Sequence, residues 1–133
     1  MIRRQLLTPA DPNLEGAFDS QGRTAPTATC LEGLLAALEF LPTRPQANES
    51  QIKLRGQIDS AVEKGIAFLM RAQIKSGPYA GGMPAAIAPS KTAVRPARGA
   101  SEVRIDFVQH ALCAWLRYEK LFMHATASGS ANN

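Results

Sequence analysis

The chain has 133 residues, of which 45% are hydrophobic and 20% charged, and this is the composition of one ordinary globular domain. That balance excludes collagen, a coiled-coil rod and a wholly disordered chain. The most apolar stretch, Gly33 to Leu38, is far shorter than the roughly 20 residues of a membrane-spanning helix, so we expect no membrane partner. Two arginines follow Met1 without the apolar segment of a secretory signal, and we therefore expect a cytoplasmic protein.

The cysteine and histidine content argues against a metal or cofactor site. Cys30 and Cys113 are too few and too far apart for a disulfide scaffold or a zinc knuckle, so we expect two reduced thiols. The only histidines are His110 and His124, and the sequence H-E-x-x-H is absent. The motifs of nucleotide binding and of the serine-hydrolase elbow are also absent. We expect neither a metal nor a cofactor.

The net charge of +4 comes from one stretch of the chain. Residues 75–100 contain no acid and four bases: Lys75, Lys91, Arg95 and Arg98. Tyr79 is the one aromatic residue there, which does not make a stacking platform or a recognition helix for nucleic acid. A solvated loop is favoured over an anion-binding loop, and we expect no nucleic-acid partner.

Helical periodicity in three segments predicts an all-α fold. The first helix is expected at about 29–41, because Thr29 and Glu32 have the spacing of a capping box and Pro42 ends the apolar pattern. The second is expected at about 50–74, and the third at about 102–123. Residues 1–26 would form an N-terminal helix remnant and loop, and the small, polar tail 124–133 is expected to be disordered.

The third segment combines a narrow polar stripe with an apolar surface on most other sides. The stripe consists of Glu102, Asp106, Gln109, His110, Cys113 and Arg117. A helix that is apolar on most sides must be buried on most sides, which two other helices do not easily achieve. We therefore expect a protein partner or self-association to cover the surplus apolar surface.

A weak two-unit repeat links the two halves of the chain. The sequences RRQL (3–6) and GAF (16–18), followed by the helix near Thr29, recur as RAQI (71–74) and GGM (81–83), followed by the helix near Glu102. This alternation resembles the α/α-toroid superfamily, in which outer and inner helices alternate around a ring, as in six-hairpin glycosidases, polysaccharide lyases and terpenoid cyclases. The resemblance implies antiparallel helical hairpins in an incomplete toroid. A truncated product, a split subunit and an independent small bundle remain open as explanations of the short chain.

The resemblance also implies where a site would lie, since inner helices of a toroid direct polar side chains into a central funnel. Asp106 and His110 stand four residues apart, so the carboxylate is expected to orient the imidazole as a general base. Glu32 is the candidate catalytic carboxylate of the first inner helix. The candidate substrate-binding residues are Gln109, Arg104 and Tyr79.

Each candidate also has a structural explanation. Glu32 is accounted for as a member of the capping box, and Asp106 lies in the first turn, where a negative charge favours the helix dipole. The polar stripe is either a site or the solvated face of an amphipathic helix. Two functional hypotheses follow: part of an α/α-toroid protein that acts on a carbohydrate or similar polar substrate and is inactive alone, or a noncatalytic helical protein-interaction module.

Overall fold

The computed structural model describes residues 1–87 and 99–123, and these residues form an all-α fold, as the periodicity predicted. Three helices, α1 (Thr24–Phe40), α2 (Glu49–Ala72) and α3 (Ile105–Tyr118), pack together. The shorter helical turns are η1 (Ile2–Arg4), η2 (Pro12–Leu14), η3 (Arg44–Gln46) and the π-helical η4 (Glu119–Met123) that continues α3. Within the described ranges, no helix has the length and apolar character needed to cross a membrane.

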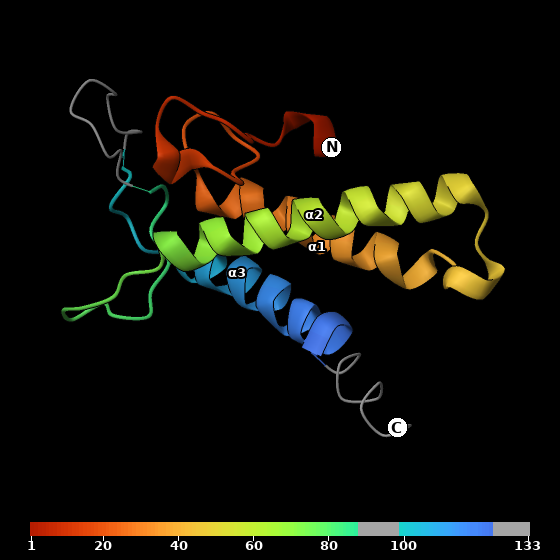
Figure 1. Cartoon of the computed structure of the whole chain (residues 1–133). Coiled ribbons are helices and arrows are strands. Elements are labelled where there is room, and N and C mark those ends of the chain that lie inside the picture. Colours follow the sequence, from red (N-terminus) through yellow and green to blue (C-terminus); the bar gives the residue numbers. More distant parts are fainter. Residues whose placement is uncertain (88–98, 124–133) are drawn as a thin grey trace, which may run out of the picture.

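Helices α1 and α2 form a hairpin, and α3 packs against α1. Helices α1 and α2 run antiparallel, and α3 starts beside the end of α2 and diverges from the hairpin toward its own C-terminus (Figure 1). Helix α3 packs mainly against α1 and only marginally against α2. One side of α3 is therefore left without a helical neighbour among the described residues. The residues that the structure describes do not form a closed ring of helices.

The core lies between α1 and α2 and takes in one face of α3. Its largest fully buried side chains include Phe68, Leu31, Leu35, Leu69 and Val62. Burying a side chain of this kind contributes about 1.5–3 kcal/mol, so the hairpin core is the main source of stability. Gly65 allows the two helices to approach closely, because a Cβ there would lie 2.6 Å from Cδ2 of Leu31.

The structure starts α1 at Thr24 rather than at Thr29. Pro26 falls in the first turn, where a missing N–H is tolerated because that group has no intrahelical partner. Thr29 consequently lies in the second turn, and its hydroxyl donates to the Ala25 carbonyl at 3.0 Å. The expected capping box with Glu32 does not form, which removes the capping explanation of Glu32.

The other helix ends differ from the expected positions by a few residues. A capping box starts α2, with Asn48 and Gln51 exchanging side-chain to backbone hydrogen bonds of 2.9 Å. Helix α3 begins at Ile105 rather than at about 102, since Val103 is engaged in an isolated β-bridge with Pro84. The expected N-terminal helix remnant is the single 3-10 turn η1.

Both units of the sequence repeat fold into the same backbone corner. In the first unit, Leu6 N donates to Ala17 O at 2.8 Å and Gly16 N donates to Leu6 O at 2.7 Å. In the second unit, Ile74 N donates to Gly82 O at 3.0 Å and Gly81 N donates to Ile74 O at 2.8 Å. The two corners are thus equivalent in hydrogen bonding, although the loops between their ends differ in length.

The glutamine of each R-x-Q sequence closes its corner. Gln5 Nε2 donates to Gly16 O at 3.1 Å, and Gln73 Nε2 donates to Gly81 O at 3.2 Å. Both glycines adopt positive φ, +87° at Gly16 and +86° at Gly81. Gln5 is buried and also donates to Ala61 O of α2 at 2.7 Å, so the first corner is fastened to the hairpin.

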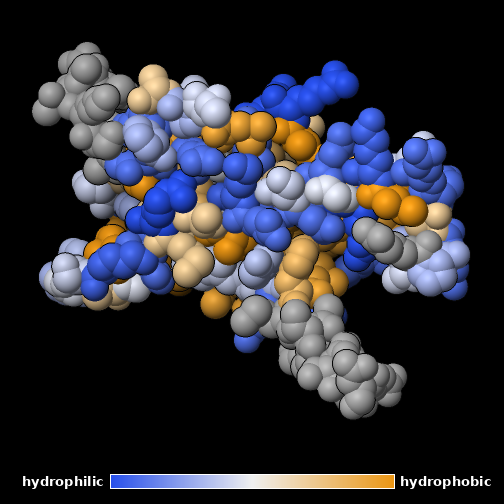
Figure 2. Space-filling view, viewed as in Figure 1, coloured by the Kyte–Doolittle hydropathy of each residue, from blue (hydrophilic) through white to orange (hydrophobic). Residues whose placement is uncertain are grey.

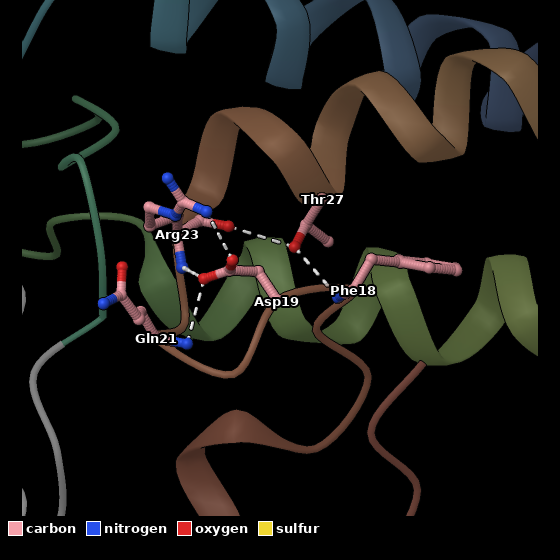
Figure 3. A network of polar contacts seen from close by, with 5 residues as sticks. All are labelled: Phe18, Asp19, Gln21, Arg23 and Thr27. Atoms are coloured by element: carbon pink, nitrogen blue, oxygen red, sulfur yellow. Dashed lines mark hydrogen bonds and ion pairs between the residues drawn. The ribbon is translucent and has the colours of Figure 1, made fainter. Parts of the chain in front are cut away.

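A polar network orders the chain just before α1 (Figure 3). The Asp19 carboxylate accepts hydrogen bonds from Gln21 N at 2.9 Å, Arg23 N at 3.3 Å and Arg23 Nη2 at 2.7 Å. Partial burial alone would raise the pKa of Asp19, but these hydrogen bonds outweigh it and hold the pKa below its usual value. Thr27 Oγ1 accepts from Phe18 N at 3.2 Å and donates to Arg23 O at 3.0 Å.

Both ends of α1 are tied to other segments. At the N-terminus, Thr24 N donates to Ala85 O at 3.0 Å, so the connection between α2 and α3 crosses the start of α1. At the C-terminus, Arg55 Nη1 of α2 donates to Leu41 O at 3.2 Å and lies 3.4 Å from Leu38 O. These contacts satisfy backbone groups at both ends of α1, and α3 packs against this helix.

Candidate functional site

The structure brings together Glu32 of α1 and His110 of α3. Nδ1 of His110 lies 2.7 Å from Oε1 of Glu32, across the interface between the two helices. The histidine side chain is 38% exposed and the glutamate side chain 28% exposed, so solvent reaches both groups. Arg117 Nη1 lies 3.5 Å from the Glu32 carbonyl, at the upper limit of a hydrogen bond.

This contact fixes the orientation of the imidazole. An ionised carboxylate only accepts hydrogen bonds, so Nδ1 of His110 must carry a proton and donate to Glu32. In a neutral ring Nε2 is then the acceptor, which is the arrangement that a general base requires. A carboxylate therefore orients His110, but it comes from the neighbouring helix rather than from Asp106.

The other candidate residues do not join this pair. Asp106 Oδ1 is bound at 3.0 Å by Nε of Arg104, whose guanidinium also lies 5.2 Å from the centre of the Phe107 ring. Gln109 is exposed on α3, and Tyr79 is exposed in the turn that follows α2. The six candidates therefore do not line one site. Of the basic residues in 75–100, Lys91, Arg95 and Arg98 lie outside the described residues.

Three hollows on the surface of the described residues lie elsewhere. The largest, about 970 Å³, lies beside Arg71, Lys75 and Pro84 at the end of α2. The second, about 810 Å³, lies between the N-terminal segment and α2, and the third, about 330 Å³, contains Arg55 and Asp59. Burial raises the pKa of Asp59. The positive charge of Arg55 partly offsets this increase, and the negative charge of Glu63 adds to it. None of the six candidate residues lines these three hollows.

No group of three or more histidine, cysteine, aspartate or glutamate side chains in the described ranges is arranged to hold a metal ion. Cys30 and Cys113 are both free thiols. Burial raises the pKa of Cys30, and the positive charges of the N-terminus and Arg4 partly counteract this.

The side of α3 that faces away from α1 carries exposed apolar residues. We call Ile105, Leu112 and Leu116 the outer stripe; their exposed fractions are 82%, 49% and 55%. At 100° per residue these three positions fall within about 40° of one another around the helix. Apolar side chains reach the surface in the region of α3 in Figure 2, whereas the visible face of α2 is mostly hydrophilic. The described residues thus leave part of the apolar surface of α3 uncovered.

The sequence predicted surplus apolar surface on the third helix but not the side on which it lies. Phe107 and Trp115 are half-buried against the core, whereas Leu112 is exposed. The indole N–H of Trp115 is buried and has no hydrogen-bond partner among the described residues. The sequence does not show which side of α3 packs against α1. That packing decides which apolar residues of α3 are covered.

The repeat indicates what the outer stripe corresponds to in the first unit. The buried faces of α1 and α3 align when two pairs are matched, Leu31 with Ala111 and Leu34 with Ala114. Leu112 then corresponds to Glu32, and Glu32 is in contact with α3. Glu32 of the first unit, which contacts His110 of α3, thus stands where the second unit has the exposed Leu112.

Comparison with known proteins adds no family. No protein-family model matches the chain. Neither the curated proteins nor the solved structures contain a match to it.

Proposed function

We propose that this protein is a noncatalytic helical interaction module that binds a protein partner through the outer stripe of α3. The observation that carries the proposal is the row Ile105, Leu112 and Leu116, which is exposed on a well-formed helix and faces away from α1. Scattered apolar residues are normal on protein surfaces, but several exposed apolar residues on one helix face are typical of an interface.

Burial of the outer stripe would contribute part of the free energy of a reversible contact. Complete burial of a Leu or Ile side chain contributes about 1.5–3 kcal/mol, and these three residues expose 49% to 82% of their surface. Covering the stripe would therefore contribute roughly 3–5 kcal/mol before the costs of association. Half-buried neighbours such as Val108 and Trp115 would extend the contact.

Site-specific photo-crosslinking in the cells that make the protein tests this proposal. A photoreactive phenylalanine derivative is placed at Leu112 or Leu116, and in a control at Glu63 or Ala67, which are exposed on α2. We expect a discrete protein adduct from positions 112 and 116 and none from the two control positions. Equal adducts at all four positions, or none at 112 and 116, would refute the interaction module.

A second candidate function is a portion of an α/α-toroid protein that acts on a carbohydrate or similar polar substrate. It is favoured by the contact of 2.7 Å between Glu32 and His110, which orients an imidazole on the surface, and by the two equivalent corners of the repeat. In this function Glu32 and His110 would provide the acid–base pair, and Gln109 would bind a sugar hydroxyl.

Titration with neutral and acidic oligosaccharides, followed by NMR of the His110 ring, tests the second candidate. Binding should shift the His110 signals, and Glu32→Gln should weaken that binding while far-UV circular dichroism stays unchanged. The same titration of Asp59→Asn, which alters a carboxylate away from α3, is the matched control. If no oligosaccharide moves the His110 signals, the carbohydrate function is excluded for this chain alone.

A further inference from the structure

The geometry points to a second copy of this chain as the partner of the outer stripe: we propose that two copies pair through α3 in antiparallel orientation. This inference rests on the proposed function, since it identifies the partner of the same surface. An isologous contact of this kind has two-fold symmetry, so the same residues occur on both sides of the interface.

Charge is distributed unevenly along residues 102–120, which contain α3 and the residues on either side of it. The start of the helix region carries two acids and one base, Glu102, Asp106 and Arg104, and its end carries two bases and one acid, Arg117, Lys120 and Glu119. The start therefore has a net charge of −1 and the end a net charge of +1. Antiparallel pairing places each end beside the opposite charge of the other copy, and the helix dipoles are also opposed. Parallel pairing would bring like charges together.

The two outermost of these charges have no ion-pair partner among the described residues. Glu102 and Lys120 are both exposed, and neither forms an ion pair with another residue in the described ranges. Asp106, by contrast, is already paired with Arg104. The pairs formed between copies would therefore join Glu102 of one copy to Lys120 of the other, twice by symmetry.

Apolar residues of α3 lie between these charges. The midpoint between residues 102 and 120 lies at Ala111, next to Leu112 in the sequence. An antiparallel pair centred one residue further along, at Leu112, places the two copies of Leu112 against each other at the two-fold axis. Leu116 of one copy then faces Val108 of the other, so apolar residues meet at these positions. The register that centres these apolar residues thus differs by one residue, about 1.5 Å along the helix, from the register that centres the charges.

Disulfide trapping tests orientation and register together. In a Cys30→Ala, Cys113→Ser background, Leu112→Cys should form an intermolecular disulfide rapidly, because its two copies meet at the axis. Leu116→Cys is the matched control: it is similarly exposed, but in the antiparallel pair its copies are offset by about 12 Å along the helix. That offset exceeds the Cα separation of roughly 7 Å that a disulfide can span. We expect at least a tenfold faster reaction for Leu112→Cys.

Charge reversal provides an independent readout from sedimentation equilibrium of the full chain. The unmodified protein should show a reversible monomer–dimer equilibrium. Lys120→Glu or Glu102→Lys alone should raise the dimer Kd about tenfold, since each change creates two like-charge contacts. The double variant should return the Kd to within about threefold of the unmodified protein, because the complementary pairs are restored with reversed sign.

Each contrary result has a separate meaning. A dimer in which Leu116→Cys reacts as fast as Leu112→Cys is parallel and overturns the proposal. A chain that stays monomeric at all concentrations also overturns it. In a monomer, rapid alkylation of Leu112→Cys by a soluble maleimide would leave the outer stripe free for a different protein, as the proposed function requires. Slow alkylation would show that the chain covers its own stripe and would refute the proposed function as well.

Discussion

Substitution of Gly16 by alanine tests the first corner of the repeat. Gly16 has φ of +87°, and a Cβ built on it lies 2.1 Å from the backbone oxygen of Lys64 in α2. Ordinary contact between these atoms requires roughly 3.2 Å or more, so α2 or the corner must move by about 1 Å. That movement would also disturb the hydrogen bonds of Gln5, which donates to Gly16 O and, in α2, to Ala61 O.

Gly81→Ala is the matched control, because Gly81 occupies the equivalent corner with φ of +86° but has no atom within 4 Å of the added Cβ. This variant has only the strain of positive φ, about 1 kcal/mol. Gly16→Ala also forces the added Cβ against the backbone of Lys64, which lowers the free energy of unfolding by about 1–3 kcal/mol more. We therefore expect losses of about 1 kcal/mol for Gly81→Ala and about 2–4 kcal/mol for Gly16→Ala.

Urea unfolding followed by circular dichroism at 222 nm measures both free energies of unfolding. At this chain length each kcal/mol lowers Tm by about 3–5 °C, so thermal scans give a second measure of the difference. A Gly16→Ala variant that is as stable as Gly81→Ala would show that the first corner does not press against α2, and would refute the packing described for it.

Three further predictions use the same unfolding assay. Gly56→Ala, in the exposed middle of α2 with nothing within 4 Å of the added Cβ, should stabilise the protein by about 0.5–1 kcal/mol, and a loss would contradict the open surroundings of Gly56. Gln5→Ala should cost about 1–3 kcal/mol because two carbonyl oxygens lose a buried donor, whereas the exposed equivalent Gln73→Ala should cost less than about 0.5 kcal/mol. Asp19→Asn should cost about 1 kcal/mol at pH 7. Since the folded pKa of Asp19 lies below its unfolded value of 3.8, its contribution is present above that value and is lost as the pH falls through the folded pKa. The deficit of Asp19→Asn should thus shrink toward pH 3, and a constant deficit would exclude this ionic network.

The three helices follow from the apolar spacing of the sequence, but their ends required information from distant residues. The start of α1 was missed because the pattern of Thr29 and Glu32 imitates a capping box, while Thr24 is held by the carbonyl oxygens of Pro84 and Ala85. No local pattern reveals that support, since those residues are some sixty positions away in the chain. The repeat, in contrast, was visible because it depends on local glutamine and glycine positions.

The sequence named candidate site residues but did not indicate which of them are in contact. Glu32 and His110 were both identified, yet their contact depends on how α3 is rotated against α1, which one helix alone does not determine. The spacing of Asp106 and His110 favoured an ion pair within α3, but Arg104, two residues before Asp106, binds the carboxylate instead. Likewise, the excess of apolar residues on α3 was evident, but the exposed side was fixed only by the packing of α1.

Hydroxyl-radical footprinting of the unmodified protein at high dilution tests the central claim, that the chain does not cover its own outer stripe. Peptide mass spectrometry would compare the oxidation rate per residue at Leu112 and Leu116 with that of buried Leu35 and exposed Leu7. We predict that both stripe residues react at rates close to that of Leu7 in the dilute protein, and more slowly as the concentration rises. Rates at Leu112 and Leu116 as low as that of Leu35 in the dilute monomer would contradict the claim.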